Sequence, residues 1–65
     1  MNKSTCTIDK NGDKYWRNSK GELYRTDGPA IEFANGTEEY WYKDKRILKK
    51  KYYSKEFQVR MVMES

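Results

Sequence analysis

The dipeptide Asn-Gly occurs twice in this chain, at Asn11-Gly12 and at Asn35-Gly36, and each copy lies between segments in which large apolar and polar residues alternate. Asn-Gly in this setting is the strongest short-range indication of a β-hairpin, because both residues accept the positive φ angles of a type I′ turn. Two hairpins occupy much of a chain of 65 residues. The pattern therefore predicts one small domain, residues 1–65, built on an antiparallel sheet.

Two-residue turns at both positions fix a predicted strand register. The predicted cross-strand pairs are Ile8–Tyr15, Thr7–Trp16, Asp9–Lys14 and Lys10–Asp13 in the first hairpin, and Ile31–Tyr40, Ala30–Trp41, Phe33–Glu38 and Glu32–Glu39 in the second. Since side chains alternate along a strand, Trp16 and Trp41 share one face of the hairpins. The other face then carries Ile8, Tyr15, Ile31, Phe33, Tyr40 and Tyr42. The opposed glutamates are unfavourable, which predicts either a different turn or a basic group between them.

The segments that follow the two tryptophans also repeat. Aligning the tryptophans aligns Leu23 with Leu48, at a period of about 25 residues that is typical of a repeat array. Between the copies, Asp27 can bond the backbone ahead of it, Gly28 supplies unusual φ/ψ angles, and Pro29 can start a strand. The predicted strands lie near residues 4–10, 13–18, 22–26, 29–34, 37–43 and 46–52.

The end of the chain is compatible with two structures. Ser54 is a suitable helix N-cap, and Phe57 and Met61 would then share one side of a helix. The same residues also alternate with polar ones, which is the pattern of a strand. We favour the helix because the cap is the more specific feature. The predicted fold class is mainly β, an antiparallel meander of hairpin repeats over residues 7–53 with a short terminal helix at 54–65.

Aromatic residues supply most of the expected core. Charged residues make up 37% of the chain and apolar residues only 35%, which alone would favour disorder. However, six Tyr, two Trp and two Phe are present, and each buries roughly 150–250 Å² when it is packed. We expect a thin, aromatic core that contains Trp16 and Trp41. Aromatic side chains on both faces are more than so short a chain can cover, which predicts an exposed surface that includes Tyr24, Tyr42, Tyr52 and Tyr53.

Positive charge is concentrated in the second half of the chain. The net charge is +4, and the segment from Lys43 to Lys51 holds six basic residues and one acid. The segment is either an electrostatic binding surface for an acidic protein or nucleic acid, or a solvated edge strand whose lysines prevent aggregation. The predicted partner-binding residues are Tyr42, Lys43, Lys45, Arg46, Lys49, Lys50, Lys51, Tyr52 and Tyr53.

The residue inventory disfavours an enzyme. Cys6 is the one cysteine and there is no histidine, so an intrachain disulfide and Cys–His catalysis are excluded, and no metal or cofactor is expected. Arg25 and Asp27 are expected to have structural roles, and a pair of carboxylates such as Glu32 and Glu39 makes no site without a cleft. No apolar run is long enough to span a bilayer and the N-terminus lacks a signal-peptide core, which favours the cytoplasm.

The pattern "NG..YW....G.L.R.DGPAI...NG....WY" resembles the MORN-like repeats of small bacteriophage and giant-virus proteins. The matching residues that we assign to the structural repeat are Asn11, Gly12, Trp16, Asp27, Gly28, Pro29, Asn35, Gly36 and Trp41. The resemblance implies stacked β-hairpins, no catalytic activity, and contact with protein or lipid. The second copy departs from the pattern from residue 45 onward, where a specific function could have been added.

These observations lead to two main hypotheses. The first is a phage-type protein-binding module in the host cytoplasm that inhibits a host protein or defence system by binding it. The alternative is a nucleic-acid-binding accessory protein that uses the basic segment 43–51. A homodimeric structural protein is a third possibility.

Overall fold

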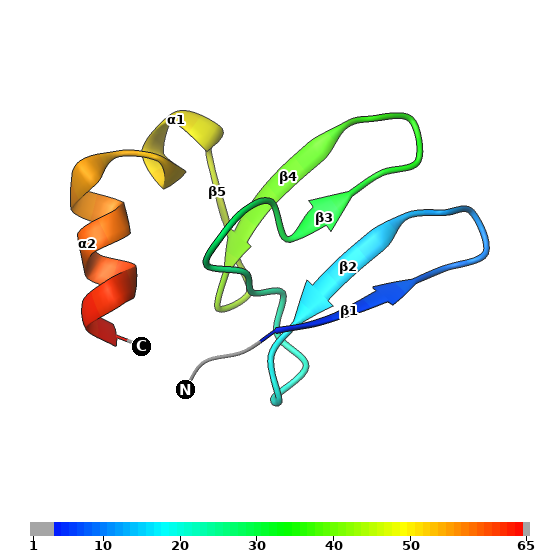
Figure 1. The fold of residues 1–65 in the computed structure, drawn as a ribbon, viewed down its shortest axis with the longest axis horizontal. Helices are drawn as coiled ribbons and strands as arrows, with labels where there is room; N and C mark the ends of the chain where they lie inside the picture. Colours follow the sequence, from blue (N-terminus) through cyan, green and yellow to red (C-terminus); the bar gives the residue numbers. More distant parts are fainter. Residues whose placement is uncertain (1–3, 65) are drawn as a thin grey trace.

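Five short strands form one antiparallel sheet in the computed structural model, which describes residues 4–64 (Figure 1). Their order in the sheet follows the chain, so the sheet is a meander as predicted. The strands are β1 (Thr5–Ile8), β2 (Lys14–Arg17), β3 (Ile31–Glu32), β4 (Glu38–Tyr42) and β5 (Lys45–Ile47). Helices α1 (Lys49–Tyr52) and α2 (Lys55–Glu64) follow and lie at the β5 end of the sheet, while the β1–β2 hairpin lies at the other end.

Both Asn-Gly dipeptides form hairpin turns, but the turns are one residue longer than predicted. In the first, the Asp9 N–H donates to the Asp13 carbonyl and the Gly12 N–H donates back to Asp9, both at 3.0 Å. Gly12 has a φ of 87°. This is a three-residue loop that ends in a left-handed glycine, the second commonest hairpin connection. The loops 18–22 and 33–37 repeat the same bonds around Gly21 and Gly36.

The extra residue makes the predicted register wrong in both hairpins. Thr7 pairs with Tyr15 and Cys6 with Trp16, while Glu32 pairs with Glu38 and not with Glu39. A shift of one residue exchanges the two faces of one strand relative to its partner. The predicted faces are therefore also wrong, because the pairing places Tyr15 and Ile31 on the face of Trp41, and Ile8 and Trp16 on the face of Tyr40 and Tyr42.

The type I′ turn occurs instead between β4 and β5, at Lys43 and Asp44. Their φ angles are 50° and 68°, although neither residue is glycine. The Asp44 N–H donates to the Leu23 carbonyl at 3.0 Å, and its Oδ1 accepts from the Leu23 N–H at 3.1 Å. Two bonds to a distant segment thus hold a backbone conformation that is uncommon for residues other than glycine.

We expect Asp44→Ala to lower the free energy of unfolding by about 1–2 kcal/mol, because the Leu23 N–H loses its acceptor. Asp44→Asn keeps an acceptor oxygen and tolerates positive φ, so its stability should stay close to that of the wild type. Urea unfolding followed by circular dichroism measures both variants. Equal losses in the two would show that the side-chain bond is not what holds the turn.

The segment between Tyr24 and Ala30 is a closed loop. The Trp16 carbonyl accepts from the Tyr24 N–H at 3.0 Å and the Trp16 N–H donates to the Ala30 carbonyl at 2.8 Å, so one residue of β2 holds both ends. Within the loop, the Arg25 Nε donates to Asp27 Oδ1 at 2.9 Å. Gly28 is not among the glycines with positive φ. A Cβ at residue 28 would lie 3.0 Å from Arg25 Cζ, so a larger residue would crowd the guanidinium of Arg25.

The core is aromatic, but tyrosines form it and the tryptophans do not. The buried cluster consists of Tyr24, Tyr40, Tyr42, Tyr52, Phe57 and Met61, with Ile47 packed against it. Neighbouring ring centroids lie 4.7–5.5 Å apart, the separation at which aromatic pairs attract. The expectation of an exposed tyrosine surface is therefore wrong for Tyr24, Tyr42 and Tyr52, whereas Tyr53 is about half exposed.

The terminal helix forms as predicted. The Ser54 Oγ accepts from the Phe57 N–H at 3.2 Å, and Phe57 and Met61 are both buried on one side of α2. Ser65 lies outside the described residues. The predicted strand 46–52 is wrong beyond Ile47, because Lys49–Tyr52 form α1. Of the predicted strand 22–26, one bridge from Leu23 to Arg17 remains.

Candidate partner-binding groove

The basic segment 43–51 does not form one continuous stripe. Lys43 lies in the β4–β5 turn, Lys45 and Arg46 in β5, and Lys49–Lys51 in α1. Because successive residues of a strand point to opposite faces, Lys45 and Arg46 diverge. Lys45 and Arg46 therefore line two different depressions.

Four of the basic side chains surround one depression between β5 and α2, which we call the basic groove. Its volume is about 370 Å³, and it is lined by Tyr42, Lys43, Lys45, Ile47, Lys51, Phe57, Arg60 and Glu64. The floor is apolar, because the rings of Tyr42 and Phe57 belong to the core. The groove therefore combines an apolar base with four cations and a single carboxylate at its rim.

The carboxylate of Glu64 lies among donors from three elements. The hydroxyl of Tyr42 in β4 donates to Glu64 Oε1 at 2.9 Å, and the Lys43 ammonium lies 3.4 Å from the same oxygen. The Arg60 Nε lies 3.5 Å from the other oxygen. The hydrogen bond from Tyr42, followed by Lys43 and Arg60, lowers the pKa of Glu64 below its ordinary value. Burial, with the bond to Glu64, raises the pKa of the Tyr42 phenol.

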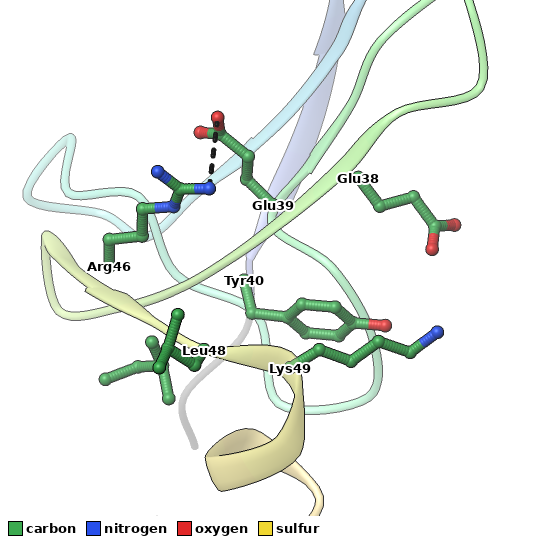
Figure 2. A pocket seen from close by; sticks show the side chains of 7 residues that line it. Glu38, Glu39, Tyr40, Arg46, Leu48 and Lys49 are labelled. Atoms are coloured by element: carbon green, nitrogen blue, oxygen red, sulfur yellow. Dashed lines mark ion pairs between the residues drawn. The ribbon is translucent and has the colours of Figure 1, made fainter.

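The second depression has balanced charges. It has a volume of about 310 Å³ and is lined by Glu38, Glu39, Tyr40, Arg46, Ile47, Leu48 and Lys49. Figure 2 shows Arg46 directed from β5 toward Glu39, with 3.8 Å between Nη2 and Oε2, while Glu38 points away from this pair. Two acids facing two bases give this depression no net preference for the charge of a partner.

The structure separates the predicted binding residues into four groups. Lys43, Lys45 and Lys51 line the basic groove together with Tyr42, whose ring is buried in its floor. Arg46 and Lys49 lie in the balanced depression. Lys50 and Tyr53 are exposed and line neither. Tyr52 is 1% exposed and is a core residue, not a contact residue.

Sequence reasoning missed Arg60 and Glu64, which complete the groove from α2. The helix prediction contained the necessary information. If Phe57 and Met61 point inward, then Glu64 falls one turn further along nearly the same side, and Arg60 lies one turn before it.

Comparison with family models, with curated proteins and with solved structures found no match for this chain. No helix among residues 4–64 is long and apolar enough to cross a membrane. Within the same residues, no three His, Cys, Asp or Glu side chains are grouped as a metal site would require.

Proposed function

We propose that this protein is a binding module that holds an acidic segment of a partner protein in the basic groove. The observation that carries the proposal is the grouping of Lys43, Lys45, Lys51 and Arg60 around an apolar floor. Cations at the rim of such a site attract acidic side chains and set the orientation of the partner, while the floor excludes water. The protein acts by occupying its partner and not by catalysis.

The exposed face of α2 favours a protein over a nucleic acid. The apolar side chains of Val59, Val62 and Met63, on the side of α2 opposite the buried Phe57 and Met61, are 48–80% exposed, and exposed apolar strips are typical of protein contacts. Proteins that bind single strands instead need aromatic faces on which bases stack. The aromatic rings in the groove, those of Tyr42 and Phe57, are each only 7% exposed.

The biological setting that we propose follows from the resemblance to MORN-like phage repeats. A small module of this kind, produced in the host cytoplasm, would inhibit a host protein or defence system by covering an acidic surface. Direct binding of nucleic acid through segment 43–51 is the alternative. It is favoured by the exposed lysines Lys49 and Lys50 on α1.

Affinity purification from bacterial lysates tests the proposal. The wild type should retain a stoichiometric protein that the Lys45→Glu/Lys51→Glu variant loses, because reversing two charges turns attraction at the groove into repulsion. Lys10→Glu/Lys20→Glu is the matched control, since both lysines are exposed in hairpin loops and neither lines the groove. That variant should retain the partner.

Two outcomes would contradict the proposal. One is the absence of any stoichiometric partner across plausible hosts. The other is that nuclease treatment releases the captured material and that the protein binds oligothymidylate. The logarithm of that binding constant should then fall by about one unit per phosphate contact for each unit of the logarithm of the salt concentration, which would support the nucleic-acid alternative.

A further inference from the structure

We propose that Glu64 occupies the subsite that receives a carboxylate of the acidic partner, and that binding displaces it. This inference rests on the proposed function, since it names the chemistry of one subsite within the basic groove. Glu64 would act as an internal competitor, so that the groove opens fully only to a segment with several acidic side chains.

The subsite is built for a carboxylate. Tyr42 is 7% exposed and its ring is fixed between Tyr24 and Phe57, at centroid distances of 5.0 and 5.5 Å. Its hydroxyl is therefore held in place before any ligand arrives, at 2.9 Å from Glu64 Oε1. Lys43 and Arg60 add charge from either side. A fixed donor between two cations suits a partner's Asp or Glu as well as it suits Glu64.

Two of the contacts that hold Glu64 in the groove are exposed ion pairs. The Lys43 and Arg60 side chains are 49% and 69% exposed, and exposed ion pairs contribute little to stability. Glu64 is also the last residue of α2, where a negative charge opposes the helix dipole. Within α2, the exposed i,i+4 ion pair with Arg60 offsets part of this effect. The contacts in the groove are what favour it.

Displacement changes the charge that the groove presents. With Glu64 in place, one carboxylate already neutralises part of the field of Lys43, Lys45, Lys51 and Arg60. When it leaves, all four cations face the incoming segment. A partner with a single acid would only replace one carboxylate by another, while a partner with several acids gains the remaining cations.

Fluorescence anisotropy with labelled octaglutamate measures this competition, with octaglutamine as the uncharged probe. Glu64→Gln removes the competing charge and keeps the shape, so octaglutamate should bind about two- to fivefold more tightly than to the wild type, the effect of one exposed ion pair. Adding Tyr42→Phe to Glu64→Gln should reverse most of that gain, since the incoming carboxylate loses the buried donor. Thermal melts establish that each variant is folded.

Glu38→Gln is the matched charge control, because Glu38 is an exposed acid on β4 outside the basic groove. An equal gain in this variant would show that net charge is responsible, and the inference would fail. It would also fail if octaglutamate bound the wild type and Glu64→Gln equally while Lys45→Glu/Lys51→Glu abolished binding, although the proposed function would then stand. If octaglutamate bound neither the wild type nor any variant at low salt, both this inference and the proposed function would be overturned. If Glu64→Gln increased the affinity for oligothymidylate more than the affinity for octaglutamate, the nucleic-acid alternative would be favoured.

Discussion

Replacing Tyr52 by phenylalanine is expected to lower the free energy of unfolding by about 1–3 kcal/mol, whereas the same replacement at Tyr24 should leave it unchanged or raise it by up to about 1 kcal/mol. Both tyrosines are 1% exposed and belong to the same core cluster. The loss of a hydroxyl therefore removes equal volume from equally buried sites, and the difference between the variants isolates the hydrogen bonds.

The Tyr52 hydroxyl connects α1 to the loop 24–30. It donates to the Arg25 carbonyl at 2.6 Å and accepts from the buried Gly28 N–H at 3.4 Å. Phenylalanine would leave both backbone groups without these bonds, and an unpaired buried polar group costs more than a bond gains. The Tyr24 hydroxyl, in contrast, forms no hydrogen bond of acceptable geometry with any residue in 4–64.

Urea unfolding of the wild type and the two variants provides the measurement. Since a domain of this size is stable by only a few kcal/mol, the loss at Tyr52 should shift the unfolding midpoint clearly. Similar losses in the two variants would show that ring packing alone, and not the hydroxyl of Tyr52, connects helix and loop.

Tyr52→Phe and the wild type should also differ in alkaline solution. Burial raises the pKa of Tyr52 from 10.0 to about 12. Above pH 10 the unfolded chain therefore loses a proton that the folded chain keeps, and the free energy of unfolding falls as the pH rises from 10 toward 12. Tyr52→Phe removes this contribution, so its stability should decline less steeply than that of the wild type over this range. An identical decline in both would contradict the assignment.

The positions of the hairpin turns could be predicted from the sequence, but their register could not. Asn-Gly is compatible with the two-residue turn and with the longer loop that ends in a left-handed glycine. The side chain that begins the loop favours the second. Asp9 Oδ1 accepts from the N–H groups of Asn11 and Asp13, and Asn18 repeats this with Lys20 and Glu22. Asp9 thus indicates the register of the first hairpin, whereas loop 33–37 begins with Phe33, whose side chain offers no such acceptor.

The two helices show the same contrast between local and distant causes. Ser54 caps α2 from within its own first turn, so sequence reasoning found it. Helix α1 has four residues and no side-chain cap, and it is anchored by Tyr52 reaching a loop 24 or more residues away. Contacts at that separation leave no local pattern, and the lysines of the segment are equally compatible with an edge strand.

The candidate groove was predictable only in part for the same reason. The concentration of basic residues identified the segment, and alternation along β5 explains why Lys45 and Arg46 separate. The contributions of Arg60 and Glu64 depend on where α2 packs, which the sequence does not state. The unfavourable pair of glutamates predicted in the second hairpin was a useful indication, because the turn does differ there and Glu32 faces Glu38 instead of Glu39. Arg25 lies 3.2 Å from Glu32.

Replacing Arg25 by methionine is expected to lower the free energy of unfolding by about 2–3 kcal/mol, because several charge-assisted bonds are lost together. The guanidinium donates to Asp27 and the Pro29 carbonyl, both at 2.9 Å, and to Glu32. It also lies 3.9 Å from the centroid of the Trp16 ring. Lysine has no planar fork of donors, so Arg25→Lys should be nearly as destabilising as the methionine variant.

Arg17→Met is the matched control for this experiment. Arg17 also lies over an aromatic ring, that of Tyr15, but at 5.2 Å and on an exposed side chain of β2. Its replacement should change the free energy of unfolding by less than about 0.5 kcal/mol. Comparable losses of unfolding free energy at the two arginines would show that the cation over the aromatic ring stabilises this part of the fold, and not the hydrogen bonds of the Arg25 guanidinium within the loop.

Gly28→Ala tests the same arrangement from the opposite side. A Cβ at this position would lie 3.0 Å from Arg25 Cζ, and the bonded guanidinium cannot retreat without losing its partners. We expect a cost of about 1–3 kcal/mol in the wild type and a much smaller one in the Arg25→Met background, where a flexible side chain can move aside. A double-mutant cycle from urea unfolding measures the coupling. Additive costs would mean that the backbone of the loop requires the glycine. Strong coupling would mean that Arg25 and Gly28 act as a single packed unit, and the anchoring of α1 by Tyr52 also depends on that unit.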